Sequence, residues 1–316
     1  MGDTLLIRAG LLNPVDANRW TFHREGGLLL EGERIVDAGP LARFRDHPAS
    51  RVLDLDGVLV PGFVDVHIHW VQHHVRGRFQ SDLMEWLREH IWPEEAGFEA
   101  DDFARRHARA FFTDTVRAGT TLGMAYSSPH LSALRLAGEA ARGDWLLGNA
   151  IMEKAAPEPL RRASPDNVDQ VAPLLAELGT GRYAITPRFA LNCSAGLMRD
   201  LGDLARRENA FVQTHLSESV NEIREIRAAF PEAEDYTDVY DRAGLLGRAR
   251  CWATASICRS ANTTPWPGAA PGSPTARPAT RPWAAGAWIW RRCAATAPAM
   301  RWLRTWAPGP ATACCT

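Results

Sequence analysis

Two histidines separated by one residue stand at the end of an apolar stretch in the first quarter of the chain. The segment "PGFVDVHIH" ends in His67 and His69, and side chains two positions apart on a strand point to the same side. Two imidazoles that face one space suit a borderline cation such as zinc. An HxH pair alone is more often two ordinary polar residues at a strand end. Here the apolar stretch, the turn at Pro61 and Gly62, and Asp65 favour a metal site.

A third histidine, His215, ends another apolar stretch in "VQTHLSESV", and Glu218 follows three residues later. At the C-terminal end of a parallel strand, His215 can complete a site with His67 and His69. A catalytic zinc usually has about three protein ligands and keeps one position open for water, whose pKa it lowers to about 7. Glu218 could then shuttle protons between that water and a substrate, or it could simply cap the start of the next helix.

Three further residues could hold a flat heterocycle. Arg188 offers a planar fork of donors, Phe189 offers a face for stacking, and the amide of Gln72 could bind an amide edge of a substrate. Each of them alone is more often a surface or packing residue. Their shared position after strands, where α/β barrels build active sites, favours a role in substrate binding.

The elements that must position these residues alternate between strand-like and helix-like segments. Short β-like runs before residue 60 predict a small antiparallel sheet, and "GVLVPGFVDVHIH" predicts a buried strand. Further along, "SPDNVDQVAPLLAELG" predicts a helix with Ser164 as its N-cap and Gly179 at its end. Repeated strand–helix units predict an α/β fold with a parallel sheet. The periodicity alone does not separate a barrel from an open sheet.

Composition narrows the class of protein. The net charge of −1 over 316 residues argues against a nucleic-acid or polyanion binder. The first 20 residues lack the pattern of a signal peptide, and no stretch approaches the roughly 20 apolar residues of a membrane span. A single cysteine before residue 250, Cys193, fits a reducing compartment. These features predict a cytoplasmic protein without a nucleic-acid or membrane partner. The small-molecule substrate is indicated by the residues that could hold a heterocycle.

Composition changes abruptly near residue 250. Every Asp, Glu and His precedes this point, whereas seven of the twelve Trp and five of the six Cys follow it. The last segment, rich in Ala, Pro, Arg, Thr and Gly, has no sustained period of 3.6 or 2, and its prolines would interrupt a helix.

The first 247 residues resemble the guanine deaminases of the amidohydrolase superfamily. This resemblance implies a metal-dependent (β/α)8 barrel and a small β-sandwich built from both chain ends. It therefore predicts part of the sandwich in residues 1–60 and an incomplete, truncated barrel in residues 61–250. The motifs that carry the resemblance are "VPGFVDVHIHWVQ", "LMEWLREHIWPEE", "VRAGTT", "YAITPRFALNCSAGLM", "FVQTHLSESVNEI" and "DYTDVYDRAGLLG".

The resemblance also implies an activity, which is the hydrolysis of guanine to xanthine and ammonia. It implies one divalent ion per chain, zinc or alternatively iron, and a homodimer. The implied roles, position by position, are metal ligands at His67, His69 and His215, a proton shuttle at Glu218, and purine contacts at Gln72, Arg188 and Phe189.

The chain departs from the family pattern after residue 250, where an HGI histidine, an HCPTSN and LGSG segment and a metal-binding aspartate are expected. None of these is present. Shifting the reading frame restores them in order: residues 251–259 can be reread as LGHGIYLSE, "SPTARPATRPWAAG" as AHCPTSNAALGSG and "RTWAPGP" as DVGAG. We therefore predict that residues 251–316 are out of frame and form a disordered tail, and that the chain as written is inactive.

Two alternatives stay open. A related amidohydrolase could act on another purine, a pterin or a triazine with the same metal ligands. Alternatively, the chain could be a catalytically dead metal-binding or purine-binding protein with a genuine C-terminal segment.

Overall fold

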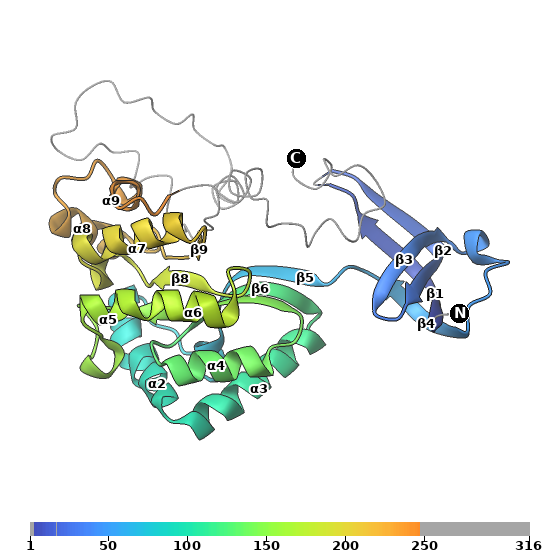
Figure 1. The fold of residues 1–316 in the computed structure, drawn as a ribbon, viewed down its shortest axis with the longest axis horizontal. Helices are drawn as coiled ribbons and strands as arrows, with labels where there is room; N and C mark the ends of the chain where they lie inside the picture. The colour runs from blue at the N-terminus through green and yellow to red at the C-terminus, as the bar shows by residue number, and fades with distance from the viewer. Residues whose placement is uncertain (1–2, 17, 247–316) are drawn as a thin grey trace. The chain divides into compact units, whose positions relative to one another are not determined.

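The computed structural model describes residues 3–16 and 18–246, which form two compact units (Figure 1). The first unit runs to Gly62 and the second begins at Phe63. Residues 251–316, for which we predict a change of reading frame and a disordered tail, lie outside the described residues.

The first unit is a four-stranded sheet in the order β3-β2-β1-β4. Strand β1 pairs antiparallel with β2, and β2 with β3, but β1 and β4 are parallel. The prediction of an antiparallel sheet is therefore wrong for β4, because the 3₁₀ helix η1 (Leu41–Phe44) and the loop after it return the chain to the beginning of β1 before β4 starts. The strands are β1 (Thr4–Pro14), β2 (Trp20–Glu31), β3 (Arg34–Pro40) and β4 (Arg51–Leu59).

The second unit contains five parallel strands in the order β5-β6-β7-β8-β9. Helices separate successive strands along the chain, so the prediction of an α/β fold with a parallel sheet is confirmed. No closed barrel is present within the described residues. The strands are β5 (Phe63–His69), β6 (Thr120–Ser127), β7 (Asp144–Ile151), β8 (Ala184–Pro187) and β9 (Phe211–Val212).

Helical segments connect these strands and cover the sheet, and α3 and α4 lie side by side against β6 and β7 (Figure 1). The α-helices are α1 (Leu83–Trp86), α2 (Trp92–Ala96), α3 (Asp101–Arg117), α4 (Leu131–Ala140), α5 (Ser164–Asp169), α6 (Val171–Leu178), α7 (Ala195–Arg207), α8 (Val220–Ala229) and α9 (Tyr236–Arg242). Shorter helical turns are η2 (Trp70–Val75), the π-helix η3 (Leu87–Ile91), η4 (Gly97–Glu99), η5 (Glu158–Leu160) and η6 (Ala190–Asn192).

The single buried strand predicted over residues 57–69 is wrong in two respects. Pro61 and Gly62 separate β4 from β5, and β5 is only partly buried, with Phe63 59% and Val64 43% exposed. The physical reason is that β5 is an edge strand of the described sheet and pairs on one side only. Its residues therefore lack half of the neighbours that would cover a central strand.

Helix boundaries follow local sequence signals in most places. Gly119, with φ +85°, follows the end of α3, and Gly179, with φ +86°, follows α6, as expected where a left-handed residue ends a helix. The predicted N-cap at Ser164 is displaced by one residue. Ser164 is the first residue of α5, and Ala163 occupies the cap position without a side-chain hydrogen bond.

Within residues 3–16 and 18–246, no helix combines the length and the apolar character that crossing a bilayer would require.

Candidate metal centre and ligand pocket

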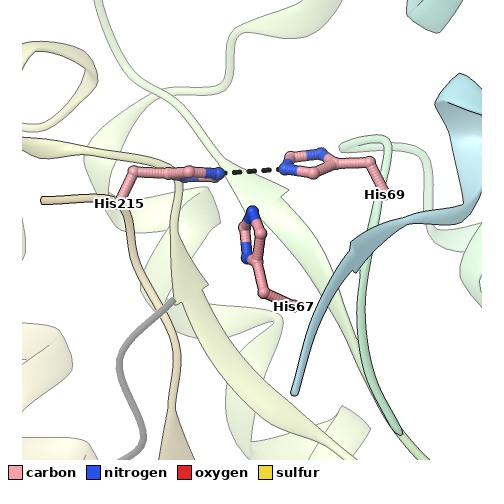
Figure 2. A group of neighbouring side chains, drawn as sticks. All are labelled: His67, His69 and His215. Atoms are coloured by element: carbon pink, nitrogen blue, oxygen red, sulfur yellow. Dashed lines mark hydrogen bonds between the residues drawn. The ribbon is translucent and has the colours of Figure 1, made fainter. Parts of the chain in front are cut away.

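Three imidazoles converge at the C-terminal edge of the parallel sheet (Figure 2). His67 and His69 belong to β5, and His215 follows β9. One ring nitrogen from each of the three lies within 4.8 Å of the others, and Nε2 of His69 is 2.9 Å from Nε2 of His215. Among the described residues, this is the one group of three or more His, Cys, Asp or Glu side chains with ligand atoms this close.

The contact between His69 and His215 requires a strongly curved sheet. Strands β6, β7 and β8 lie between β5 and β9, so four intervals of about 4.8 Å would separate the outer strands by about 19 Å in a flat sheet. Two histidine side chains cannot span that distance. The outer strands therefore bend toward each other on the side that carries the histidines, which is the curvature of a barrel wall.

Backbone groups of the β8 loop fix the orientation of the His215 ring. The carbonyl of Arg188 accepts from His215 Nδ1 at 2.6 Å and from the His215 backbone N–H at 3.1 Å. Because a carbonyl can only accept, Nδ1 carries the proton and Nε2 presents a lone pair. A metal-binding histidine commonly donates its second ring N–H in this way.

The two histidines of β5 are held by their neighbours. The ring of His69 stacks on Tyr126 of β6, with centroids 4.4 Å apart and planes at 18°, and the His67 ring lies edge-on to the same tyrosine at 5.2 Å. The backbone N–H of His67 donates to Asp65 Oδ1 at 3.1 Å. These contacts limit how far the imidazoles can turn away from each other.

Burial keeps all three imidazoles neutral. It lowers the pKa of His67 to about 3, an effect that the charges of His215 and Arg188 reinforce and that of Glu218 opposes. It likewise lowers the pKa of His215 to about 3, helped by Arg188, and holds the pKa of His69 well below its usual value. A neutral imidazole has a nitrogen lone pair that can bind a cation, so the low pKa values favour a metal ion over protons at this site.

The donor set fits a metal ion. Zinc binds imidazole nitrogen at about 2.0–2.1 Å, so two nitrogens on one ion are at most about 4.2 Å apart. The His69 and His215 nitrogens lie 2.9 Å apart, and the nitrogens of all three residues lie within 4.8 Å of one another, so a small movement of His67 would bring the set onto one ion. Imidazole suits zinc and iron alike. His67, His69 and His215 could therefore hold one divalent ion.

One cavity of about 230 Å³ brings all the predicted site residues together. It is smaller than the roughly 300–1,000 Å³ pockets of drug-sized ligands, which suits a single small heterocycle. Its polar lining and Phe189 are the residues to which the sequence pointed, and Leu83, Trp86 and Leu87 add an apolar wall. The predicted residues in this lining are His67, His69, Gln72, Arg188, Phe189, His215 and Glu218.

A buried carboxylate, Glu95 of α2, connects two of these residues. Its Oε1 accepts from Gln72 Nε2 at 2.9 Å, and its Oε2 accepts from Arg188 Nη1 at 2.5 Å. Glu95 is 0% and Arg188 3% exposed, so the ion pair is formed away from bulk water. The Gln72 amide and the Arg188 guanidinium are therefore both held by the Glu95 carboxylate.

The loop between His215 and α8 places Glu218 at the pocket. Ser217 adopts φ +55°, a left-handed conformation that is uncommon for a residue other than glycine. The helix cap is formed by Ser219 and Glu222, which make a reciprocal capping box. The structure thus assigns capping to Glu222, whose Oε2 accepts from the Glu218 backbone N–H at 2.7 Å.

Two tyrosines of α9 support the same loop from behind. Tyr240 OH donates to the His215 carbonyl at 2.7 Å, and Tyr236 OH donates to Glu222 Oε1 at 2.8 Å. Both tyrosines are fully buried. The backbone on both sides of Ser217 is therefore fixed by hydrogen bonds from α8 and α9.

Glu95, Tyr126 and Glu222 are site residues that were not predicted from the sequence. A usable signal existed for Glu95, since Leu83, Leu87, Ile91 and Glu95 follow one another at intervals of four. A charge that continues an apolar helical stripe indicates a buried and partnered carboxylate. The S-x-x-E spacing from Ser219 to Glu222 is a local signal for a capping box. No spacing in the sequence points to Tyr126, because its partners are brought together only by folding.

The curved parallel sheet and the three-imidazole centre define an α/β protein with a candidate metal site at its strand ends. The chain belongs to the amidohydrolase family, because the Amidohydrolase family model matches residues 58–266, more than half of its length.

Named relatives refine this assignment. The chain is 33% identical over 206 residues to guanine deaminase of Escherichia coli (strain K12), and 34% identical over 207 residues to the probable guanine deaminase of Deinococcus radiodurans. Each match covers 63% of this chain and 47% of the relative. The solved structure of the E. coli guanine deaminase superposes with a TM-score of 0.74 at 28% identity, over 80% of this chain and 61% of that one. The chain thus spans about half the length of the curated relatives it matches.

Proposed function

We propose that this chain carries the metal-binding and purine-binding part of a guanine deaminase active site. The observation that carries the proposal is the single cavity that joins the three histidines to Gln72, Arg188, Phe189 and Glu218. The similarity to proteins named guanine deaminase supports the choice of substrate. The reaction is hydrolytic: guanine and water give xanthine and ammonia.

In this proposal His67, His69 and His215 would hold one zinc ion, a metal that three histidine ligands suit in catalytic sites. When bound, it supplies an activated water near neutral pH. The Nδ1–H···O=C bond from His215 to Arg188 keeps its Nε2 unprotonated, so this nitrogen would be able to bind the ion.

Residues of the chain bind the purine and move its protons. Phe189 stacks on the ring, while Gln72 and Arg188 hydrogen-bond to its edge. Glu218 takes a proton from the attacking water and gives it to the purine. The oxygen of that water bonds to the ring carbon, and the second proton of the water passes to the exocyclic amino group. The bond from the ring carbon to the exocyclic nitrogen then breaks, so ammonia leaves and the oxo group of xanthine remains.

The sheet is part of a (β/α)8 barrel. The strand order follows chain order without the reversal typical of doubly wound sheets, and the contact between His69 and His215 demands barrel-like curvature. In this proposal, residues 1–60 are one half of a small β-sandwich, and the functional protein is a homodimer.

The 316-residue chain itself is inactive in this proposal. The family pattern requires a further histidine and a metal-binding aspartate after residue 250, and the sequence has no His or Asp there. A three-histidine site would still bind zinc, but the full set of groups for catalysis would be missing.

Two proteins test the function: the 316-residue chain, and the product of the same gene with its reading frame restored after residue 250. We expect both to bind about one zinc, and only the frame-restored protein to form xanthine and ammonia from guanine. Glu218→Gln in that protein should lower kcat at least about 100-fold, whereas Glu225→Gln on the exposed side of α8 should not.

Other outcomes decide between the alternatives. Turnover of a pterin or a triazine without turnover of guanine would show that this heterocycle, and not guanine, is the substrate. Xanthine formation by the 316-residue chain would contradict its inactivity. If the gene holds no alternative frame for the missing motifs, and the chain binds purine without turnover, it is a binding protein.

A further inference from the structure

We propose that Glu95 is a positioning residue that determines which hydrogen-bonding edge of a ligand the pocket accepts. By holding the Gln72 amide and the Arg188 guanidinium, it presents one acceptor and a set of donors to the ligand. The ligand class is then a planar heterocycle with a ring N–H beside an oxo group or ring nitrogen, such as an oxopurine. The identity of the ligand rests on the proposed function, whereas the orientation of Gln72 does not.

The contacts of Glu95 leave little freedom in its surroundings. Its two oxygens have separate partners, Gln72 Nε2 on Oε1 at 2.9 Å and Arg188 Nη1 on Oε2 at 2.5 Å. With 0% exposure, this carboxylate has no water to replace either partner. A buried carboxylate that loses a partner is strongly destabilised, so both side chains stay attached to it.

The orientation of the Gln72 amide follows from this contact. A carboxylate paired with arginine can only accept hydrogen bonds, so Gln72 must turn its NH₂ group toward Glu95. Its Oε1 makes no hydrogen bond within the described residues, and the side chain lines the cavity beside the three histidines. Gln72 therefore has an acceptor available for a ligand N–H.

Arg188 supplies hydrogen-bond donors to the pocket, whereas Gln72 supplies an acceptor. One of its terminal nitrogens binds Glu95, and in the described part of the chain its other guanidinium N–H groups have no acceptor. Because Arg188 also lines the cavity, these N–H groups are available for an oxo group or ring nitrogen of the ligand. Its backbone carbonyl holds His215 at the same time, so an Arg188 fixed by Glu95 also helps to fix the metal centre.

The position of Glu95 on its helix explains how the chain reaches this arrangement and offers a matched control. Leu87 and Ile91 are buried on the face that Glu95 continues. The preceding residue, Glu94, points another way and pairs with His74 and Arg78 at 3.2 and 2.8 Å. Glu94→Gln therefore makes the same chemical change one residue away, outside the pocket.

The first experiment measures the orientation of Gln72 without any ligand. The chain has four glutamines, so selective ¹⁵N-glutamine labelling gives four side-chain NH₂ signals, with Gln72→Met identifying that of Gln72. In the zinc-loaded 316-residue chain, we expect the Gln72 NH₂ to exchange with solvent at least about tenfold more slowly than that of exposed Gln80. Buried Gln213, which donates to Thr186 Oγ1 at 3.0 Å, is the internal standard for protection.

Glu95→Gln should remove the protection of Gln72, and Glu94→Gln should leave it unchanged. A Gln72 signal that exchanges as fast as that of Gln80 while Gln213 is protected would overturn the proposal. This result is obtained on the unsubstituted chain, so it stands even if Glu95→Gln does not fold.

The second experiment measures selectivity by equilibrium dialysis of the zinc-loaded chain with guanine, 1-methylguanine and 9-methylguanine. Each methyl group removes one ring N–H. We expect at least one methylated compound to bind the unsubstituted chain about tenfold or more weakly than guanine, since a site built to hydrogen-bond an N–H rejects a ligand without it. This ratio should fall below about threefold in Glu95→Gln and persist in Glu94→Gln.

The outcomes separate this proposal from the proposed function. An unchanged ratio in Glu95→Gln, or no measurable binding of any of the three compounds, overturns the role of Glu95. If the ratios behave as expected but the frame-restored protein does not deaminate guanine, the proposed function fails and the role of Glu95 stands. If the frame-restored protein deaminates guanine but the binding ratio is unchanged in Glu95→Gln, the proposed function stands and the role of Glu95 fails.

Discussion

Burial decides the charge of the individual residues around the pocket. His67, His69 and His215 are held neutral. Glu95, which is also buried, forms an ion pair with Arg188. Glu222 differs from Glu95 because its partners are a hydroxyl and two backbone N–H groups rather than a cation. Burial raises the pKa of Glu222 to about 7, although these three donors lower it.

The raised pKa of Glu222 predicts a pH-dependent stability. Its folded-state pKa of about 7 exceeds the ordinary value of 4.5, so the folded state binds the proton more tightly than the unfolded state. Its stabilising contribution is fully present below pH 4.5 and is lost as pH rises through about 7. Relative to Glu222→Gln, the unsubstituted chain should lose on the order of 3 kcal/mol of unfolding free energy between pH 5 and 8.

Urea denaturation of both proteins at several pH values between 5 and 8 measures this difference. Glu225→Gln, which changes an exposed glutamate on the same helix, is the control and should follow the unsubstituted chain. A difference between Glu222→Gln and the unsubstituted chain that stays constant over this pH range would show that Glu222 does not titrate there.

At the scale of the elements, a glycine makes room for close packing at the centre of the sheet. A Cβ atom at Gly148 of β7 would lie 1.8 Å from Thr186 Oγ1, 2.4 Å from the Ala184 carbonyl and 2.9 Å from Gln213 Nε2. Gly148 therefore leaves the space in which β8 and the Gln213 side chain approach β7 next to the histidine centre. Strand β7 cannot accept a side chain there without moving its neighbours.

Gly148→Ala should lower the free energy of unfolding by about 1–3 kcal/mol or more, because the added methyl group overlaps atoms of β8. Gly138→Ala in α4 is the matched control. It adds the same methyl group where no atom lies within 4 Å and should raise stability by about 0.5–1 kcal/mol, as alanine does in a helix. Equal urea midpoints for the two variants would refute the crowding argument.

At the scale of the whole molecule, the metal centre joins the first and last described strands of the sheet. His67 and His69 come from β5 and His215 follows β9, 146 residues after His69. Residues of β5 also line a second cavity of about 590 Å³, which shares His67, His69 and Gln72 with the first. A bound ion would therefore oppose flattening of a sheet that is not closed within the described residues.

Zinc should consequently stabilise the second unit against unfolding. At a free zinc concentration 100 times the dissociation constant, we expect a gain of about 2.7 kcal/mol, and removal by a chelator should reverse it. His215→Ala should abolish the gain, while His47→Ala, at an exposed histidine of the first unit, should retain it. Thermal melting with and without zinc measures the effect, and an equal shift in His215→Ala would place the ion elsewhere.

The sequence by itself determined the type and order of the elements. Apolar runs and helix-ending glycines predicted alternating strands and helices, and the parallel sheet was confirmed. Local signals sufficed to predict these elements because whether a segment forms a helix or a strand depends largely on residues that are close in sequence. The same signals missed the parallel pairing of β4 and the exposure of β5, since both depend on which strands become neighbours.

The types and spacing of the site residues also pointed to the pocket, because HxH, QTHLSE and TPRF each place polar groups at the end of a strand or directly after it. The sequence did not determine that Glu95 binds both Gln72 and Arg188, or that the Arg188 carbonyl sets the His215 tautomer. Only the tertiary structure decided these points. Such hydrogen bonds join residues 23 to 93 positions apart, and they exist only once the sheet has curved and excluded water.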